Sequence, residues 1–548
     1  MPLKNIHSAS TPGYQIVLSA SNFWLVHIRL RRNAAPGYTR RRLTDMANGV
    51  QAVDVLFLHA GGANPRGLQG PLFPIGLIGL ASQLEKCGYT AAIVNVLLEK
   101  ILRPDFDLDA TLKDYAPRLI GIDLHWFVHC YEAVELARAC KSILPATPVV
   151  LGGLTASVFA EEILDNMPSI DFVIAGDAEK PMVELVGALQ GSAVPLADVP
   201  NLVYRLPDGR VVRSGHRYAA STAEMDELDF LRFDLVHNFA EHLHLMNTDY
   251  LPLQEPRRTA ELGDYYVATA IKNWVVYMGR GCPYGCSFCG GAASAHERAS
   301  GSSLRLRSPA TVADDILQLD ALGFELVYIS HSPLTLGSGY HSKLLDRIAA
   351  KRSRLSLGFI FEDCPFHVDL DIVGRYLSLF NPEKSIVRLY VAGVDDKAAV
   401  VNGLPANTRE LGELVRYLSG RARVMVGALI GLPQQSRDST KKMGELLLAL
   451  RSLGARIVIY NAELHPASAI HSCPERYGAS LSLKTFMDYH DFLEAKTDKS
   501  MTYGYTTAND VTLAQQRQIL TEMLHGPEDV AATQRLRSLF ERPASTSS

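Results

Sequence analysis

Three cysteines lie within eight residues near the middle of the chain. The stretch "GRGCPYGCSFCGG" contains Cys282, Cys286 and Cys289, whereas the other five cysteines are scattered over the sequence. A disulfide needs two thiols and a structural zinc ion needs four ligands. Three thiolates can hold three irons of a 4Fe–4S cluster, whose usual complement is four cysteines. The spacing therefore predicts a cluster whose fourth iron is open to a substrate or cofactor.

The alternative for this motif is a zinc site with His296 as its fourth ligand. Structural zinc motifs usually contain two paired ligand knuckles, and His296 stands alone. Gly281 and Gly285 allow the backbone to turn tightly around a compact inorganic core. The iron–sulfur interpretation is therefore favoured over zinc.

The cysteines follow a predicted strand at 273–279, the first of six strands that alternate with helices. The other five are expected at 325–330, 355–361, 385–393, 422–433 and 455–464. Six such units predict a partial or full parallel barrel, in which active sites lie at the carboxyl ends of the strands. The cysteine motif falls at that mouth.

An earlier alternation predicts a second α/β unit. Short apolar strands are expected at 53–62, 90–96, 118–126, 148–153 and 171–176. Strands that alternate with helices form a doubly wound parallel sheet, which binds ligands beyond its carboxyl ends. A hairpin with a Pro-Asp-Gly turn is predicted over 202–215.

These patterns divide the chain into five parts. We expect a disordered or over-extended N-terminus at 1–45, an α/β domain at 50–190, a connector with the hairpin at 191–270, a partial barrel at 271–480, and a helical segment with a frayed tail at 481–548. The first part contains no Asp or Glu before Asp45, and Met46 is an alternative start.

Bulk composition limits the classes of function. The 548 residues carry a net charge of -4, which gives no electrostatic footprint for nucleic acid. No apolar run is long enough for a membrane span. Eight cysteines in a chain of this length, without a convincing secretory signal, indicate a reducing, cytoplasmic location.

The cysteine spacing, with Phe288 before the last cysteine, resembles the signature of radical S-adenosylmethionine (SAM) enzymes. The resemblance implies that the open iron binds the amino and carboxylate groups of SAM. It also implies that Asp395 binds the SAM ribose and that the backbone of Gly427 and Gly431 meets the adenine. One departure follows the second barrel strand, where relatives often have acidic residues and this chain has "SHS" at 330–332. The contacts to the SAM amino group are therefore left unassigned.

The order of the two units resembles that of cobalamin-dependent radical SAM enzymes. The resemblance implies that the first domain carries cobalamin on the carboxyl ends of its strands. Gly152 and Gly153 would let the backbone approach the nucleotide tail, and Thr155 and Ser157 would hydrogen-bond it. The stretch "AGDAEKP" at 175–181 resembles the family loop after the fifth strand.

We expect no histidine below the cobalt. The stretch "DLHWFV" begins like the motif that supplies such a histidine, but it lacks the final glycine and follows the third strand instead of the first. His125 is therefore interpreted as a structural or pocket residue. Arg66, in the loop expected to line the lower face, is interpreted first as a solvated charge.

The resemblance implies a methyltransferase that moves a methyl group from SAM, via methylcobalamin, to an unactivated carbon or a phosphinate phosphorus. The acceptor would be a small secondary-metabolite precursor such as an antibiotic intermediate, and the phosphinate P-methylases are one candidate for a close relative. An oxidative cyclase or ring-rearranging enzyme is the main alternative, and an iron–sulfur or cobalamin sensor is the remote one. Methylthiolation is rejected, because Cys87, Cys130 and Cys140 are expected to be small buried helix residues.

The partners expected are a small-molecule substrate and an electron donor such as flavodoxin or ferredoxin, with no nucleic acid and no membrane. No catalytic residue is assigned. Four polar residues at predicted strand ends are candidates to face the substrate, and each is equally consistent with an ordinary barrel-end residue: His331, Tyr390, Glu463 and His465.

Overall fold

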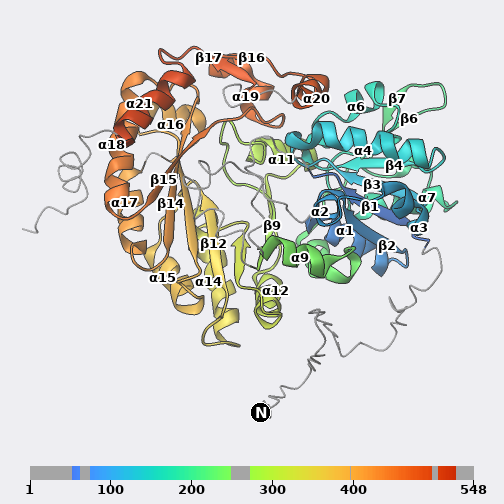
Figure 1. The fold of residues 1–548 in the computed structure, drawn as a ribbon, viewed down its shortest axis with the longest axis horizontal. Coiled ribbons are helices and arrows are strands. Elements are labelled where there is room, and N and C mark those ends of the chain that lie inside the picture. Colours follow the sequence, from blue (N-terminus) through green and yellow to red (C-terminus); the bar gives the residue numbers. More distant parts are fainter. Residues whose placement is uncertain are drawn as a thin grey trace, which may run out of the picture. The chain divides into compact units, whose positions relative to one another are not determined.

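The computed structural model describes residues 52–61, 75–247, 272–394, 396–405, 407–495 and 504–525. The chain divides into two compact units, Met1–Val50 and Gln51–Ser548, and every described residue belongs to the second (Figure 1). The expectations for 1–45, Arg66 and Asp395 lie outside the described residues.

The first sheet has seven strands in the order β2-β1-β3-β4-β5-β6-β7. Strands β1 to β5 are parallel, and the hairpin of β6 and β7 continues the sheet in antiparallel pairing. The strands are β1 (Val55–His59), β2 (Ala91–Asn95), β3 (Leu119–Asp123), β4 (Val149–Gly152), β5 (Phe172–Ile174), β6 (Leu202–Arg205) and β7 (Val211–Arg213). The strand order reverses between β1 and β3, which is where such sheets bind ligands.

Helices cover both faces of this sheet, as its continuously apolar strands require. Val55 and Phe57 of β1 belong to a core shared with α1 and α7, and Leu56 and Leu58 to a core shared with α4 and α6. These helices are α1 (Ile75–Lys86), α4 (Cys130–Ile143), α6 (Ala160–Asn166) and α7 (Glu179–Leu189).

The second sheet has six parallel strands in the order β15-β14-β13-β12-β11-β8. They are β8 (Asn273–Val276), β11 (Leu326–Ile329), β12 (Gly358–Asp363), β13 (Ile386–Val391), β14 (Arg423–Ile430) and β15 (Arg456–Asn461). Among the described strands β15 and β8 have no pairing with each other, so the barrel is partial. The predicted fold class, a doubly wound sheet followed by a partial (β/α)6 barrel, is confirmed.

Helices lie along the outer side of the barrel strands (Figure 1). They are α12 (Pro309–Ala321), α14 (Ser338–Ala349), α15 (Leu370–Leu379), α17 (Thr408–Leu418) and α18 (Arg437–Ser452). Local signals set their starts: Ser308 caps α12 ahead of Pro309, and Ser436 forms a capping box on α18. No helix of the described residues is long and apolar enough to cross a membrane.

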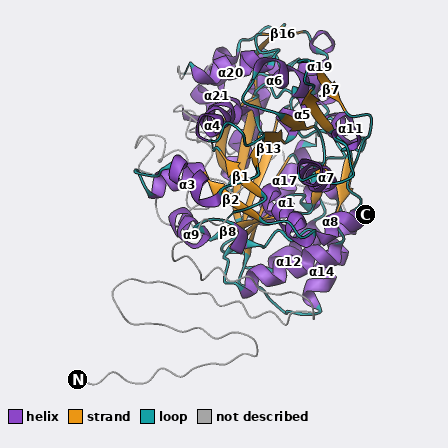
Figure 2. Cartoon of the chain, turned by 90° about the vertical axis from the view of Figure 1, so that its right-hand side faces the viewer, coloured by secondary structure: helices purple, strands orange, loops and turns teal. Residues whose placement is uncertain are grey.

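The last two described helices pack against helices of both α/β parts. Helix α20 (Phe486–Glu494) packs against α4 of the first domain, and the two lie side by side in both views (Figures 1 and 2). Helix α21 (Leu513–His525) packs against α18 of the barrel. The segment after residue 480 therefore contributes to the contact between the two α/β parts.

Candidate functional site

The cysteine loop is held by a small hairpin at the mouth of the barrel. Strand β9 (Gly279–Gly281) pairs with β10 (Leu304–Leu306), and the Cys282 amide donates to the Ser303 carbonyl at 2.9 Å. Gly281 has a φ of +87°, and a Cβ there would lie 1.9 Å from the Ser303 oxygen. The turn that starts the loop therefore requires glycine.

The three thiols interact with one another. Cys286 is buried, and Cys282 and Cys289 are half-buried; all three are free thiols. The pKa of Cys282 is raised to about 11, chiefly by burial and in smaller part by the charge of Cys289. Burial also raises the pKa of Cys286, with Cys289 and Cys282 as additional causes. Because the thiolates disfavour one another without a cation, this donor set fits a metal cluster that binds all three.

His296 does not share this environment. It lies on α11 (Ala293–Ser300), directly after the loop, and burial lowers its pKa to about 4. The charges that act on it belong to His125, Asp177 and two arginines, and no cysteine is among them. Helix α11 itself packs against the first domain, where Ala295 and Ala299 cluster with Leu154.

Two residues that sequence reasoning missed lie beside the thiols. Cys364, after β12, packs in the same apolar cluster as Cys286 and Cys289. Asp363 accepts a hydrogen bond from Thr335, and burial raises its pKa to about 7. Its Oδ2 is buried without a hydrogen-bond partner in the described structure. The signal in the sequence was the pair "DC" at the end of an apolar strand.

The barrel glycines are in close contact with other residues. A Cβ on Gly427 would lie 2.8 Å from the rings of Tyr390 and Tyr460, so this glycine makes room for two packed tyrosines. Gly431 has a φ of +89°; its amide donates to Gln516 at 2.8 Å and its carbonyl accepts from Tyr505 at 3.0 Å. The predicted adenine contact stays a prediction.

The four predicted pocket residues all follow or end barrel strands. His331 Nε2 lies 2.8 Å from the Gly281 carbonyl, next to the first cysteine. Tyr390 donates to Glu362 at 2.5 Å. Glu463 is half-buried. His465 packs against Gly290: a Cβ added to Gly290 would lie 2.9 Å from the Cβ of His465.

His465 also contacts the first domain. Its ring centroid lies 5.8 Å from that of Trp126 and 5.2 Å from that of Phe127, and burial lowers its pKa to about 4. The residues after β3 therefore meet the cysteine loop through His465.

The predicted cobalamin loops of the first domain are bonded to one another. Thr155 donates to the His125 carbonyl at 2.9 Å, and Ser157 donates to the Gly153 carbonyl at 2.7 Å and accepts from the Gly176 amide at 3.0 Å. Gly153 has a φ of +111°, and a Cβ there would lie 2.7 Å from the backbone of residues 124 and 125. The loops after β3, β4 and β5 thus form one surface, in which both hydroxyls already have partners.

An ion cluster joins this surface to the cysteine loop. Arg280, two residues before Cys282, binds Glu179 with Nη1 3.0 Å from Oε2 and binds Asp177 at 2.9 Å. Arg305 on the neighbouring β10 also binds Asp177. The two carboxylates belong to the "AGDAEKP" stretch. This stretch therefore connects the two domains in addition to its predicted role.

Several histidines gather at the carboxyl ends of β1 and β3. His59 Nδ1 lies 2.8 and 3.0 Å from the two carboxylate oxygens of Asp123. The pKa of His59 is raised: burial lowers it, but Asp123 outweighs that effect. His129 stacks edge-on against His59 at 5.7 Å, and burial lowers its pKa to about 4. His125, the predicted pocket residue, lies against Trp126 in the same group.

The cysteines of the first domain lie in its helices or beside them. Cys130 and Cys140 are buried on α4, as expected. Cys87, expected to be buried, is exposed, because α1 ends at Lys86 and Cys87 opens the following turn.

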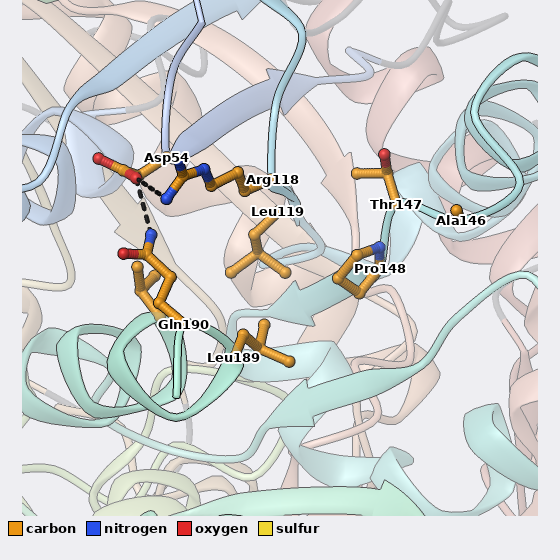
Figure 3. Close-up of a pocket in the computed structure, with 9 residues that line it drawn as sticks. Asp54, Arg118, Leu119, Ala146, Thr147, Pro148, Leu189 and Gln190 are labelled. Carbon is orange, nitrogen blue, oxygen red and sulfur yellow. Dashed lines mark hydrogen bonds and ion pairs between the residues drawn. The ribbon is translucent and has the colours of Figure 1, made fainter. Parts of the chain in front are cut away.

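A surface pocket lies at the opposite, amino-terminal end of the first sheet (Figure 3). Asp54 there pairs with Arg118 at 3.5 Å and accepts from Gln190 at 2.7 Å. Ligands of doubly wound sheets bind at the carboxyl ends of the strands, so this pocket has no part in the candidate site.

Comparison with known proteins agrees with the two-domain arrangement. Residues 67–186 match the B12 binding domain family. The fold resembles that of the radical S-adenosylmethionine methyltransferase TsrM from Kitasatospora setae, solved with cobalamin and a 4Fe–4S cluster bound. The TM-score is 0.59 at 17% identity, covering 90% of this chain and 92% of that one.

Curated relatives match over part of their length. Cytidylyl-2-hydroxyethylphosphonate methyltransferase from Streptomyces wedmorensis is 25% identical over 48% of this chain and 51% of its own. Anaerobic magnesium-protoporphyrin IX monomethyl ester cyclase from Rubrivivax gelatinosus is 28% identical over 48% of this chain and 42% of its own. Hopanoid C-3 methylase from Methylococcus capsulatus is 23% identical over 47% of this chain and 42% of its own. The chain spans about half the length of these relatives.

The chain thus has a region that matches the B12 binding domain family, followed by a partial barrel with a three-cysteine loop. Its fold is like that of a solved radical SAM methyltransferase. Both methyltransferases and cyclases occur among its relatives.

Proposed function

We propose that the protein is a cobalamin-dependent radical SAM methyltransferase acting on a small molecule. The acceptor atom would be an unactivated carbon or a phosphinate phosphorus of a secondary-metabolite precursor. When bound, the cluster would supply the electron that cleaves SAM, and the cobalamin would carry the methyl group. The electron would reach the cluster from a donor such as flavodoxin or ferredoxin.

The observation that carries the proposal is the contact between the cysteine loop and the strand-end loops of the first domain. Arg280 binds Glu179 and Asp177, and His465 lies between Gly290 and the aromatic residues that follow β3. Radical chemistry and methyl delivery require their cofactors to face one substrate, and these contacts support the proposal because they join the two loops that would bind the cofactors.

In this arrangement, Cys282, Cys286 and Cys289 would bind the cluster. Gly152 and Gly153 would let the first domain's backbone approach the cobalamin tail. His331, Tyr390, Glu463 and His465 would line the substrate space at the barrel mouth. The half-buried Glu362, bonded to both Arg388 and Tyr390, would hold Tyr390 in place.

The test is a product assay on anaerobically reconstituted protein with SAM and a reductant. A methyltransferase should form 5′-deoxyadenosine and, once its acceptor is present, S-adenosylhomocysteine as well. Replacement of the three loop cysteines by alanine should abolish both products, and the matched variant Cys473→Ala, at an exposed position, should not. Absence of 5′-deoxyadenosine above the uncoupled background would favour a sensor.

A cyclase is the second candidate, because the Rubrivivax gelatinosus relative is named as one. A cyclase should form 5′-deoxyadenosine in proportion to product but no S-adenosylhomocysteine beyond the level without acceptor. The phosphonate named in the Streptomyces wedmorensis relative makes phosphonates and phosphinates the first acceptors to test.

A further inference from the structure

Cys364 comes one residue after the end of β12, at the mouth of the barrel. Side chains alternate between the two faces of a strand. Phe359 and Phe361 belong to the core shared with the outer helices, whereas Ile360 packs with Leu326 and Ile386 on the other face. Glu362 follows on this inner face and bonds Arg388 and Tyr390 of β13. Cys364 follows beyond the end of the strand and packs in one cluster with Tyr390 and Tyr460, which come from the barrel strands β13 and β15.

The cysteine loop covers this position. Cys364, Cys286 and Cys289 belong to one apolar cluster. The ring of Tyr284, from the cysteine loop, stacks on Phe366 at a centroid distance of 3.4 Å and an interplanar angle of 3°. The segment after β12 therefore packs directly against the loop that would hold the cluster.

Cys364 shares its apolar cluster with Cys286 and Cys289, and Cys282 lies on the same loop as these two. No other cysteine of the described residues has such a relation to the loop: Cys130 and Cys140 are buried in α4, and Cys87 and Cys473 are exposed. Four thiols thus converge at the mouth, and four is the usual complement of a 4Fe–4S cluster.

We propose that Cys364 is a displaceable fourth thiolate ligand of the cluster in the resting protein. The proposal rests on the function proposed above, in which SAM binds the fourth iron. On SAM binding the iron–sulfur bond to Cys364 breaks, and bonds from iron to the amino nitrogen and a carboxylate oxygen of SAM form. The ammonium group of SAM loses one proton and the released thiolate gains one, so charge and atoms balance without an oxidant or reductant.

This ligand would give the resting cluster a protection that three cysteines cannot. An iron held by one protein ligand fewer is the first to be lost on oxidation, which leaves a 3Fe–4S cluster. With Cys364 bound, every iron has a thiolate, and the open position exists only when SAM is present to occupy it.

The test compares wild type, Cys364→Ala and Cys364→Ser, with Cys87→Ala as the matched control. Each protein is reconstituted anaerobically, matched for iron and sulfide, and titrated with ferricyanide without SAM. The 3Fe–4S EPR signal and the iron retained are measured. Both Cys364 variants should give a several-fold larger 3Fe–4S signal than wild type and Cys87→Ala, with loss of about one iron in four.

A second measurement is the affinity for SAM by equilibrium dialysis. Without a thiolate to displace, Cys364→Ala should bind SAM several-fold more tightly than wild type. Equal oxidation behaviour, or unchanged or weaker SAM binding in the variants, would overturn the role of Cys364. If wild type itself holds no iron–sulfur cluster, the proposed function fails as well, so the two failures are distinguishable.

Discussion

The guanidinium of Arg280 lies against the carboxylate of Glu179, with Nη1 3.0 Å from Oε2. One residue comes two positions before the first loop cysteine, and the other begins α7 of the B12 binding domain. Both side chains are largely buried. This pair therefore ties the position of the cysteine loop to the domain that would carry the cobalamin.

Arg280→Gln should destabilise the protein strongly, because it leaves Glu179 buried without its cation. Loss of one partner of a buried pair costs about 3–5 kcal/mol. Urea unfolding followed by circular dichroism measures the change. The matched variant Arg347→Gln, which removes an exposed pair with Asp314, should leave the midpoint nearly unchanged. Equal shifts of the urea midpoint in the two variants would show that the buried Arg280 pair stabilises the protein no more than an exposed pair does.

Gly153→Ala should be far more damaging than Gly152→Ala. At Gly153 the φ is +111° and a Cβ would lie 2.7 Å from the Leu124 carbonyl, whereas a Cβ on Gly152 meets only the Ile174 oxygen at 4.0 Å. A non-glycine residue in such a conformation costs about 1–3 kcal/mol, and the clash adds to it. Thermal unfolding of both cobalamin-free variants measures the difference. A smaller loss for Gly153→Ala than for Gly152→Ala would contradict the loop geometry.

His341 should make the protein less stable in mild acid. It is buried against the Tyr376 hydroxyl, with Nδ1 2.7 Å away, and burial lowers its pKa to about 3. The unfolded chain binds the proton near pH 6.5, so stability is lost as pH falls below that value and until it reaches the folded pKa. At pH 5 the loss is about 2 kcal/mol.

The measurement is the urea midpoint at pH 7 and pH 5 for wild type and His341→Gln. The variant lacks the titrating group, so its midpoint should fall less between the two pH values. An equal or larger fall in His341→Gln would show that His341 is not responsible.

Cobalamin bound to the protein should show no nitrogen superhyperfine splitting from a histidine in its Co(II) EPR spectrum. This prediction from the sequence stays untested by the fold. The structure does identify the residue to replace if it is wrong: His59, at the end of β1, is oriented by Asp123 as metal-binding histidines often are. Splitting in wild type that disappears in His59→Gln would reverse the prediction and assign the ligand.

The strands of both sheets could be predicted from the sequence because buried parallel strands are short, continuous apolar runs. "VVLG" at β4 and "VMVGALI" in β14 are examples. The three-cysteine loop is likewise a local pattern, since its spacing alone brings the thiols together. The place of this loop at the barrel mouth could then be predicted, because the loop directly follows the first predicted barrel strand.

Relationships across the sequence could not be predicted in the same way. Cys364 reaches the loop only through the register of β12, and Arg280 reaches Glu179 only through the contact of two domains. The cofactor contacts of the Thr155 and Ser157 hydroxyls stay a prediction, and the sequence did not show that each hydroxyl also bonds a neighbouring loop where three strand ends meet. The sequence alone does not show which polar groups the tertiary structure brings within hydrogen-bonding distance of one another.

The central claim is that Cys282, Cys286 and Cys289 hold an iron–sulfur cluster that faces a bound cobalamin. The most direct test is the metal content of anaerobically purified protein, measured for iron, cobalt and zinc together with acid-labile sulfide. The account predicts about four irons and four sulfides per chain, and cobalt retained as cobalamin. Replacement of the three cysteines by alanine should remove the iron and leave the cobalt. Stoichiometric zinc without iron would contradict the account.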